Sequence, residues 1–421
     1  MIKKETLPNG MTVVTESIDY ANSVSMGIWV KAGSRGETAE MAGISHFLEH
    51  MNFKGTERRS AKELAEVLEC RGGSLNAYTT KEYTSYYCQV VEEDFRLALD
   101  VLADLYLHSQ FREEDVTKEK NVVLEEINLY EDSPEDLVID MLNEVFWGSH
   151  PLARPILGYE KTVNAFTSQD LFHYRNRSYL PQNTILAVAG KIDHEAILEE
   201  AAKLFGDFGR NASDLSFPSP LCHSGKITAE KDIAQEHICL GYPGVSIFHP
   251  DYYALVLANE VLGGGASSRL FQRIREEMAL SYSVFSYITA YRDCGMVSIY
   301  AGTSKGKGET VHSLCLEEVG ELQRNGISAE ELDKLKGQIS GGMRIGLDSI
   351  GSRLNRLGRN ELYYGRSVPI EEVVASINRV TNEDIVRVAR EYMAEDKAAY
   401  AFLGGKHEST GGSKDATVAL I

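Results

Sequence analysis

The sequence has few of the features that mark secreted, membrane-spanning or nucleic-acid-binding proteins. Its 421 residues include six cysteines, no two of them in a Cys-x-x-Cys pair. A disulfide framework is not expected in so long a chain, and reduced thiols in the cytoplasm are the simpler interpretation. No run of about 18 apolar residues is present, which argues against a membrane span. The first residues contain no apolar segment typical of a signal peptide.

Positive charge is scarce as well. The chain has 43 lysines and arginines against 62 aspartates and glutamates, a formal net charge of −19. A protein that binds nucleic acid needs a basic face, so this balance argues against a nucleic-acid partner. A negative field could attract basic peptides. Solubility is the alternative reason for the same charge.

Two distant segments carry the same pattern. One begins at Thr167 and reads TSQDLFHYRNRSYLPQNTILAVAG, and the other begins at Thr381 and reads TNEDIVRVAREYMAEDKAAYAFLG. Each predicts a capped helix, a turn that contains a tyrosine, and an apolar strand. The order of strand-like and helical patterns before these segments also repeats. We therefore predict an internal duplication that produces two homologous domains.

Both domains are predicted to be α+β, each a mostly antiparallel sheet with helices packed on one face. Residues 206–225 are rich in Gly, Ser, Asp and Pro, which is typical of a linker. The expected boundaries are 1–210 for the first domain, 211–228 for the linker and 229–421 for the second domain. The polar end of the chain, GGKHESTGGSKDATVALI, is expected to fray.

The stretch GISHFLEHMNFKGT places His46, Glu49 and His50 in an otherwise apolar helical run. Histidines at positions i and i+4 lie on one face of a helix, and Glu49 points to the same side. H-x-x-E-H is the inverzincin zinc motif, and zinc accepts imidazole and carboxylate while leaving a position for water. The matching segment of the second half, LANEV ending at Val261, has no histidine. Packing of the scaffold therefore does not require these histidines.

A third ligand is expected from the segment EEDVTKEKNVVLEEINLYEDSPED. Glu119 and Glu126 lie seven residues apart and so share one face of a helix. Two apolar residues lie between them on that side, Val122 and Val123. The face is therefore expected to be partly buried, and a metal is one partner that a buried carboxylate can have. A solvated acidic helix, paired with Lys118 and Lys120, is the alternative for either glutamate.

HFLEHMNFKGT followed by VVLEEI resembles the pitrilysin/insulinase metallopeptidases, in particular their bacterial and mitochondrial processing-peptidase branch. Nearly the whole chain is similar, including LPNGMTVV, GGSLNAYTTKEYTSYY, LGGGASSRLFQRIREEMALSYSV and GLDSIGSRLNRLGRNELYYG. The resemblance implies one zinc ion per chain and two domains that form half of a clam-shell peptidase chamber. The zinc ligands that it implies are His46, His50 and Glu126.

The same resemblance implies roles for the residues around the zinc. Glu49 would be the general base, and Glu119 would be a supporting acidic residue near the ligand helix. Asn52 departs from the family pattern, in which an apolar residue is usual, but it lies beside the motif rather than within it.

Substrate contacts are implied in both halves. An extended peptide would add as a strand along SLNAYTT, beside Asn76 and Ala77, although Asn76 is equally typical of a turn after two glycines. Arg275, within a helix expected over 267–278, and Tyr282, after that helix, would contact the substrate carbonyl and are suitable donors for a developing oxyanion. Taken without the resemblance, Arg275 would pair with its two neighbouring glutamates at the surface.

The expected function is therefore a zinc metalloendopeptidase that cleaves peptides, unfolded chains or presequence-like segments, without a nucleic-acid or membrane partner. A non-catalytic scaffold or partner subunit of the same fold is the alternative. Longer relatives have four such domains in one chain, so the active form is expected to be a homodimer in which Arg275 and Tyr282 act in trans. A heterodimer is the rival, but the intact zinc motif and LGGGASS occur together in this chain.

Overall fold

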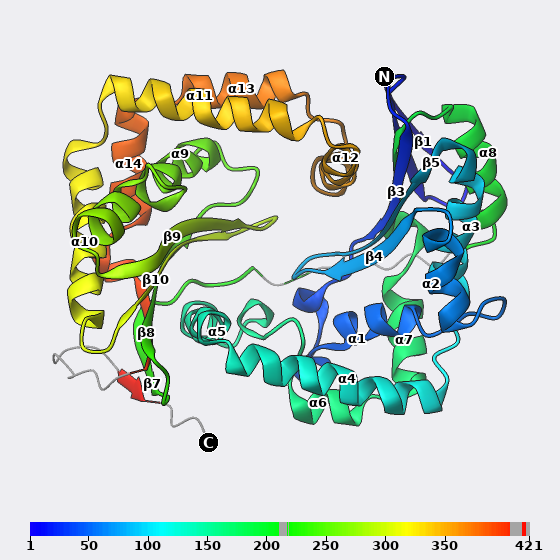
Figure 1. Cartoon of the computed structure of the whole chain (residues 1–421), viewed down its shortest axis with the longest axis horizontal. Coiled ribbons are helices and arrows are strands. Elements are labelled where there is room, and N and C mark those ends of the chain that lie inside the picture. Colours follow the sequence, from blue (N-terminus) through cyan, green and yellow to red (C-terminus); the bar gives the residue numbers. More distant parts are fainter. Residues whose placement is uncertain (210–216, 218, 405–414, 418–421) are drawn as a thin grey trace. The chain divides into compact units, whose positions relative to one another are not determined.

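A computed structural model of the chain describes residues 1–209, 217, 219–404 and 415–417, and it consists of two compact units (Figure 1). Unit 1 comprises Met1–Ile127, Pro155–Phe217 and Met343–Pro369, and unit 2 comprises Asn128–Arg154, Pro218–Gly342 and Ile370–Ile421. Each unit therefore takes one segment from the other half of the sequence, unlike the contiguous ranges 1–210 and 229–421. Residues 211–216 and 218 of the expected linker 211–228 lie outside the described residues.

Unit 1 contains a six-stranded sheet in the order β1-β2-β6-β3-β5-β4. Its strands are β1 (Ile2–Thr6), β2 (Thr12–Ser17), β3 (Ser23–Val30), β4 (Ser74–Thr79), β5 (Thr84–Val91) and β6 (Thr184–Gly190). Only β2 and β6 run parallel, and the other neighbours are antiparallel, as predicted. Both central strands, β3 and β6, are almost fully buried because both faces of the sheet are covered. Strand β4 lies at one edge.

Helices from the first half of the chain cover one face of this sheet. They include α1 (Ile44–Asn52), α2 (Ala61–Glu69), α3 (Phe95–His108), α4 (Glu113–Asp132), α6 (Glu160–Ala165), α7 (Ser168–Ser178) and α8 (His194–Phe205). Helix α12 (Ile350–Tyr364), from the second half, covers the other face. There Leu354 and Leu357 join Val14 and Trp29 in one apolar cluster, whereas Val13 belongs to the core under the first-half helices.

Unit 2 repeats this topology, with the order β12-β7-β11-β8-β10-β9. Its strands are β7 (Gly225–Glu230), β8 (Gln235–Gly244), β9 (Ser281–Ala290), β10 (Gly295–Ser304), β11 (Ala399–Gly404) and β12 (Asp415–Thr417). The run β7-β11-β8-β10-β9 matches β2-β6-β3-β5-β4 in order and in relative strand direction. The predicted internal duplication is thus confirmed. Strand β12 belongs to the end of the chain that was expected to fray.

In unit 2, too, one face of the sheet is covered by a helix from the other half of the sequence. Helix α5 (Pro134–Trp147), from the first half, packs on β7, β8 and β11 (Figure 1). The remaining helices are α9 (Tyr252–Gly263), α10 (Gly308–Asn325), α11 (Ala329–Gly346), α13 (Ile370–Arg379) and α14 (Asn382–Tyr392). The predicted capped helices after Thr167 and Thr381 both form, each with a complete capping box. None of the helices within the described residues has the length and apolar character needed to cross a bilayer.

The packing of α12 on the sheet of unit 1 depends on a close contact between this helix and strand β3, which a glycine substitution can test. A Cβ atom added at Gly358 would lie 2.5 Å from the buried Trp29 ring, so Gly358→Ala should destabilise unit 1 by about 1–3 kcal/mol through overpacking. Gly337→Ala, in α11, is the control, because nothing lies within 4 Å of its added Cβ and it should be neutral or slightly stabilising. Denaturant unfolding measures both. Equal midpoints for the two variants would contradict the proposed contact.

Candidate metal centre

Helix α1 carries the H-x-x-E-H motif and is anchored at its N-terminus. Gly43 caps it with a φ of 94°, and a Cβ there would lie 2.4 Å from the Leu157 carbonyl oxygen, so only glycine fits. The Glu37 carboxylate accepts the backbone N–H groups of Gly43 (2.7 Å) and Ser45 (2.8 Å). Two of the helix's unpaired amides are thereby satisfied. The start of the motif is consequently held at a defined place.

Two helices bring three ligand atoms together. Glu126 Oε2, on α4, lies 3.6 Å from His46 Nε2 and 3.5 Å from His50 Nε2. These residues form the single set of candidate metal ligands found among the described residues, with all ligand atoms within 4.8 Å. Zinc bonds of about 2.0–2.1 Å in a tetrahedron put ligand atoms about 3.3 Å apart. The donor types and their spacing therefore fit zinc.

The two imidazoles differ in environment. Burial lowers the pKa of His46 to about 3, so its ring is neutral over the physiological range. Burial would also lower the pKa of His50, but the hydrogen bond and charge of Glu119 outweigh it and raise that pKa. Metal binding at His50 Nε2 requires the neutral ring and therefore competes with protonation of this histidine. Both rings can thus present a lone pair to a cation.

Glu119 lies behind His50, on the side away from Glu126. Its Oε1 atom is 2.8 Å from His50 Nδ1, and its Oε2 atom is 2.6 Å from Lys54 Nζ. Burial would raise the pKa of Glu119, but these two partners lower it below the usual range. The solvated-helix alternative does not describe Glu119, which is 3% exposed.

The neighbouring residues of α4 complete this picture. Lys118 contacts Asp115 at 3.8 Å, and Lys120 donates to the Asn164 carbonyl oxygen at 2.9 Å. The face between the two glutamates is buried at Val123, whereas Val122 is 49% exposed. The face is therefore partly buried, as expected, and Val123 is the valine that contributes to the core.

Glu49 lies on α1 between the two histidines. Its carboxylate accepts a hydrogen bond of 2.5 Å from Thr79 Oγ1, at the end of strand β4. Burial raises the pKa of Glu49, even though this hydrogen bond opposes the shift. A partly buried carboxyl with a raised pKa is suited to exchanging a proton.

Asn76 and Ala77 lie within β4, so Asn76 is a strand residue and not a turn residue. Strand β4 pairs with β5 and forms the edge of the sheet beyond it. The Ala77 N–H donates to the Asn76 side-chain oxygen at 2.8 Å. This edge leads directly to Thr79, which contacts Glu49, and Figure 1 shows β4 close to α1.

Arg275 and Tyr282 lie in unit 2, and they contact each other. The Arg275 guanidinium lies 4.6 Å from the Tyr282 ring centroid and donates to the Tyr282 carbonyl oxygen at 3.2 Å. It also contacts Glu276 at 3.4 Å, so the expected surface pair forms as well. The segment Phe271–Glu277 is a π-helix, where an ordinary helix was expected. Such segments often occur at functional sites.

The sequence reasoning missed three residues that contact the predicted ones, namely Lys54, Thr79 and Phe271. Phe271 lies under the Arg275 guanidinium at 4.5 Å, so the arginine contacts two aromatic rings. Its spacing of four residues from Arg275 was the available signal. The unusual Asn52 also has an explanation, because its side-chain amide donates to the buried Tyr86 hydroxyl at 2.7 Å.

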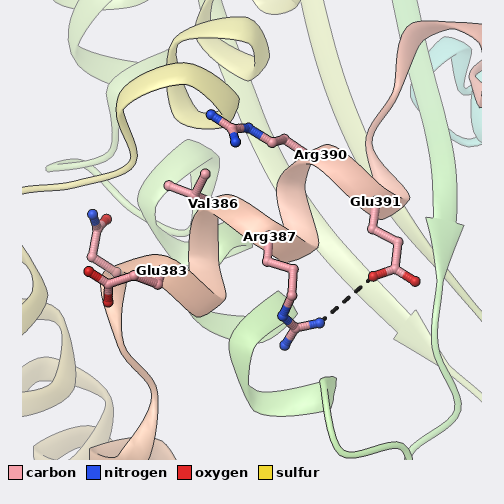
Figure 2. Close-up of a pocket in the computed structure, with 6 residues that line it drawn as sticks. Glu383, Val386, Arg387, Arg390 and Glu391 are labelled. Atoms are coloured by element: carbon pink, nitrogen blue, oxygen red, sulfur yellow. Dashed lines mark ion pairs between the residues drawn. The ribbon is translucent and has the colours of Figure 1, made fainter.

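A separate hollow of about 560 Å³ lies on unit 2 along α14 (Figure 2). Its two arginines are already engaged. Arg387 binds Asp251 at 2.6 Å and contacts Glu391 at 3.8 Å, and Arg390 donates to the Gln323 carbonyl oxygen at 2.6 Å. The hollow therefore offers no catalytic set comparable to that of unit 1.

Comparison with known proteins shows similarity to peptidases along both halves of the chain. Residues 12–160 match the family model described as insulinase (peptidase family M16), and residues 165–339 match the peptidase M16 inactive domain. An uncharacterized zinc protease of Bacillus subtilis is 42% identical over 94% of this chain and 97% of its own length. One of Streptomyces coelicolor is 36% identical over 93% of this chain and 87% of its own length.

Solved structures support the fold. The crystal structure of a protease from Helicobacter pylori has a TM-score of 0.90 at 24% identity, over 96% of this chain and 99% of that one. The crystal structure of a peptidase M16 inactive domain from Pseudomonas fluorescens has a TM-score of 0.89 at 20% identity, over 97% and 98%. At such identities the likeness concerns the fold alone.

Proposed function

Because the chain belongs to the insulinase (M16) family of peptidases, we propose that it is a zinc-dependent endopeptidase with its catalytic centre in unit 1. The observation that carries the proposal is the cluster of His46 Nε2, His50 Nε2 and a Glu126 carboxylate oxygen within 4.8 Å. The second half matches an inactive-domain model, which supports placing the chemistry in the first.

In the proposed reaction, His46, His50 and Glu126 hold one zinc ion per chain. Bound zinc would polarise the scissile carbonyl and lower the pKa of its water. Glu49 would take one proton of the water as the water oxygen adds to the scissile carbonyl carbon, and it would deliver this proton to the leaving amine as the C–N bond breaks. The Thr79 hydroxyl holds the Glu49 carboxylate at a defined orientation through its 2.5 Å hydrogen bond.

The proposed substrates are extended peptides and unfolded or presequence-like segments. An edge strand such as β4 can pair only with a backbone whose donors and acceptors are free. Asn76 and Ala77 lie on this edge, and Thr79 joins it to Glu49. The net charge of −19 supports a preference for basic segments. The cytoplasm remains the proposed location of the reaction.

A non-catalytic scaffold of the same fold is the alternative function. A scaffold has no use for a buried carboxylate–imidazole cluster that is costly without a cation. Here the ligand set, Glu49 and Glu119 are all present in one unit. The complete set therefore favours the enzyme.

We also propose that the active form is a homodimer. The chain carries the metal ligands in unit 1 and the Arg275–Tyr282 pair in unit 2. Tyr282 is 78% exposed and so is free to contact another molecule. In a two-fold dimer each pair would serve the partner's metal centre and give two equivalent sites.

Metal content tests the ligand assignment. The wild type should hold one zinc per chain, and His50→Ala should lose it because two remaining protein ligands bind zinc weakly. His173→Ala, an exposed histidine of α7, is the matched control and should retain it. Native mass spectrometry reads the stoichiometry. Full zinc in His50→Ala would contradict the assignment.

Removing the proposed base should separate chemistry from binding. Glu49→Gln should keep zinc but lose at least about a hundredfold in cleavage of an unfolded polypeptide, the usual scale for a general base. Glu66→Gln, an exposed residue of α2, should cleave normally. The folded form of the same polypeptide should be cut more slowly by the wild type. Undiminished cleavage by Glu49→Gln would assign the base elsewhere.

Mixing inactive variants tests the dimer. Glu49→Gln chains and Arg275→Ala/Tyr282→Ala chains should each be inactive, because each lacks one part of every site. After full random exchange, each mixed dimer has one intact site, so activity should recover to about a quarter of wild type. If exchange is verified by mass and no activity returns, the pair does not act in trans.

A further inference from the structure

One buried carboxylate, Glu119, contacts a proposed metal ligand from the side opposite the metal, and it has two hydrogen-bonding partners. Glu119 is 3% exposed, and its two oxygens are divided between His50 Nδ1 at 2.8 Å and Lys54 Nζ at 2.6 Å. The other imidazole has no comparable support, since His46 Nδ1 is buried without a hydrogen-bond partner among the described residues. Among the described residues, Glu119 is therefore the group that holds a ligand imidazole at its Nδ1 atom.

Lys54 is the ammonium that compensates this buried carboxylate. The lysines next to Glu119 in sequence point elsewhere, toward Asp115 and the Asn164 carbonyl oxygen. A buried carboxylate without a cationic partner is costly, and it either turns toward water or takes up a proton. In both cases the carboxylate would hold the His50 ring less firmly.

The turn after α1 fixes where Lys54 begins. Gly55 follows it with a φ of 116°, a conformation that other residues rarely adopt. Thr56 then donates to the fully buried Asp104 carboxylate at 2.9 Å, and Arg59 binds the same carboxylate at 2.6 Å. The backbone on the C-terminal side of Lys54 is thus tied to α3. The Lys54 side chain therefore extends to Glu119 from a backbone whose position is fixed by these contacts.

We infer that Lys54 is a positioning residue of the metal centre, which holds Glu119 against His50 Nδ1 and so keeps His50 Nε2 directed at the metal. The inference rests on the proposed zinc site. Carboxylates that orient a ligating histidine typically contribute 10–100-fold to metal affinity. Lys54 has an opposing effect, because its positive charge also repels a cation. Orientation outweighs repulsion here, since Glu119 neutralises the ammonium at 2.6 Å.

The test is the zinc dissociation constant, measured by competition with a chromophoric chelator at one pH. Lys54→Met keeps the length of the side chain and removes its charge, and it should weaken zinc binding about 10–100-fold. Lys54→Arg should restore most of the affinity. Lys62→Met is the matched control, because Lys62 is 79% exposed and contacts Glu66 at 3.5 Å, and it should bind as the wild type does.

A double variant distinguishes positioning from general loss of structure. Adding Lys54→Met to Glu119→Gln should weaken zinc binding little further, because the lysine acts through that carboxylate. Unchanged or tighter binding by Lys54→Met, or fully additive losses in the double variant, would overturn the inference. If Lys54→Met does not fold, Lys54→Gln, alone and combined with Glu119→Gln, tests the inference by the same comparison. Absence of zinc binding by the wild type would instead contradict the proposed function.

Discussion

The contact between α1 and α4 is the constraint on which the candidate metal centre depends. It places two imidazoles and two carboxylates in one partly buried volume, where each group is costly unless the others compensate it. Apolar residues of the same helices, such as Phe47 and Val123, form the core that keeps the contact closed. The polar groups therefore cannot become solvent-exposed unless the apolar packing of the two helices is lost. The proposed zinc ion would compensate the remaining negative charge among them.

The H-x-x-E-H motif occurs in one of the two duplicated units only. The sheets of the two units match strand by strand, and α9 follows β8 as α1 follows β3. Helix α9 is apolar where α1 carries histidines, because the matching residues Leu257 and Val261 are buried hydrophobic side chains. The fold is thus stable without the metal ligands. Unit 2 instead presents an exposed aromatic surface around Arg275, in a segment whose helix is wound differently.

The exchange of α5 and α12 ties the two halves of the chain to each other. Each sheet has one face covered by helices of its own half and the other face covered by a helix of the opposite half. Because both faces are covered, the central strands can be apolar on both sides, as β3 and β6 are. Helix α12 also contacts the edge strand proposed to bind substrate, since Tyr78 of β4 donates to Asn355 of α12 at 3.1 Å.

The sequence by itself determined what local periodicity can encode. A spacing of three and four residues put His46, Glu49 and His50 on one face of a helix, and repeated capping signals revealed the duplication. Periodicity also put Glu119 and Glu126 on one face, but it could not say which of them meets which nitrogen. Only the packing of α4 against α1 decided that Glu119 faces Nδ1 and Glu126 faces Nε2 of His50. The partners Lys54 and Thr79, the edge position of β4 and the exchanged helices were likewise decided by tertiary structure, because they join segments whose separation in the chain carries no periodic signal.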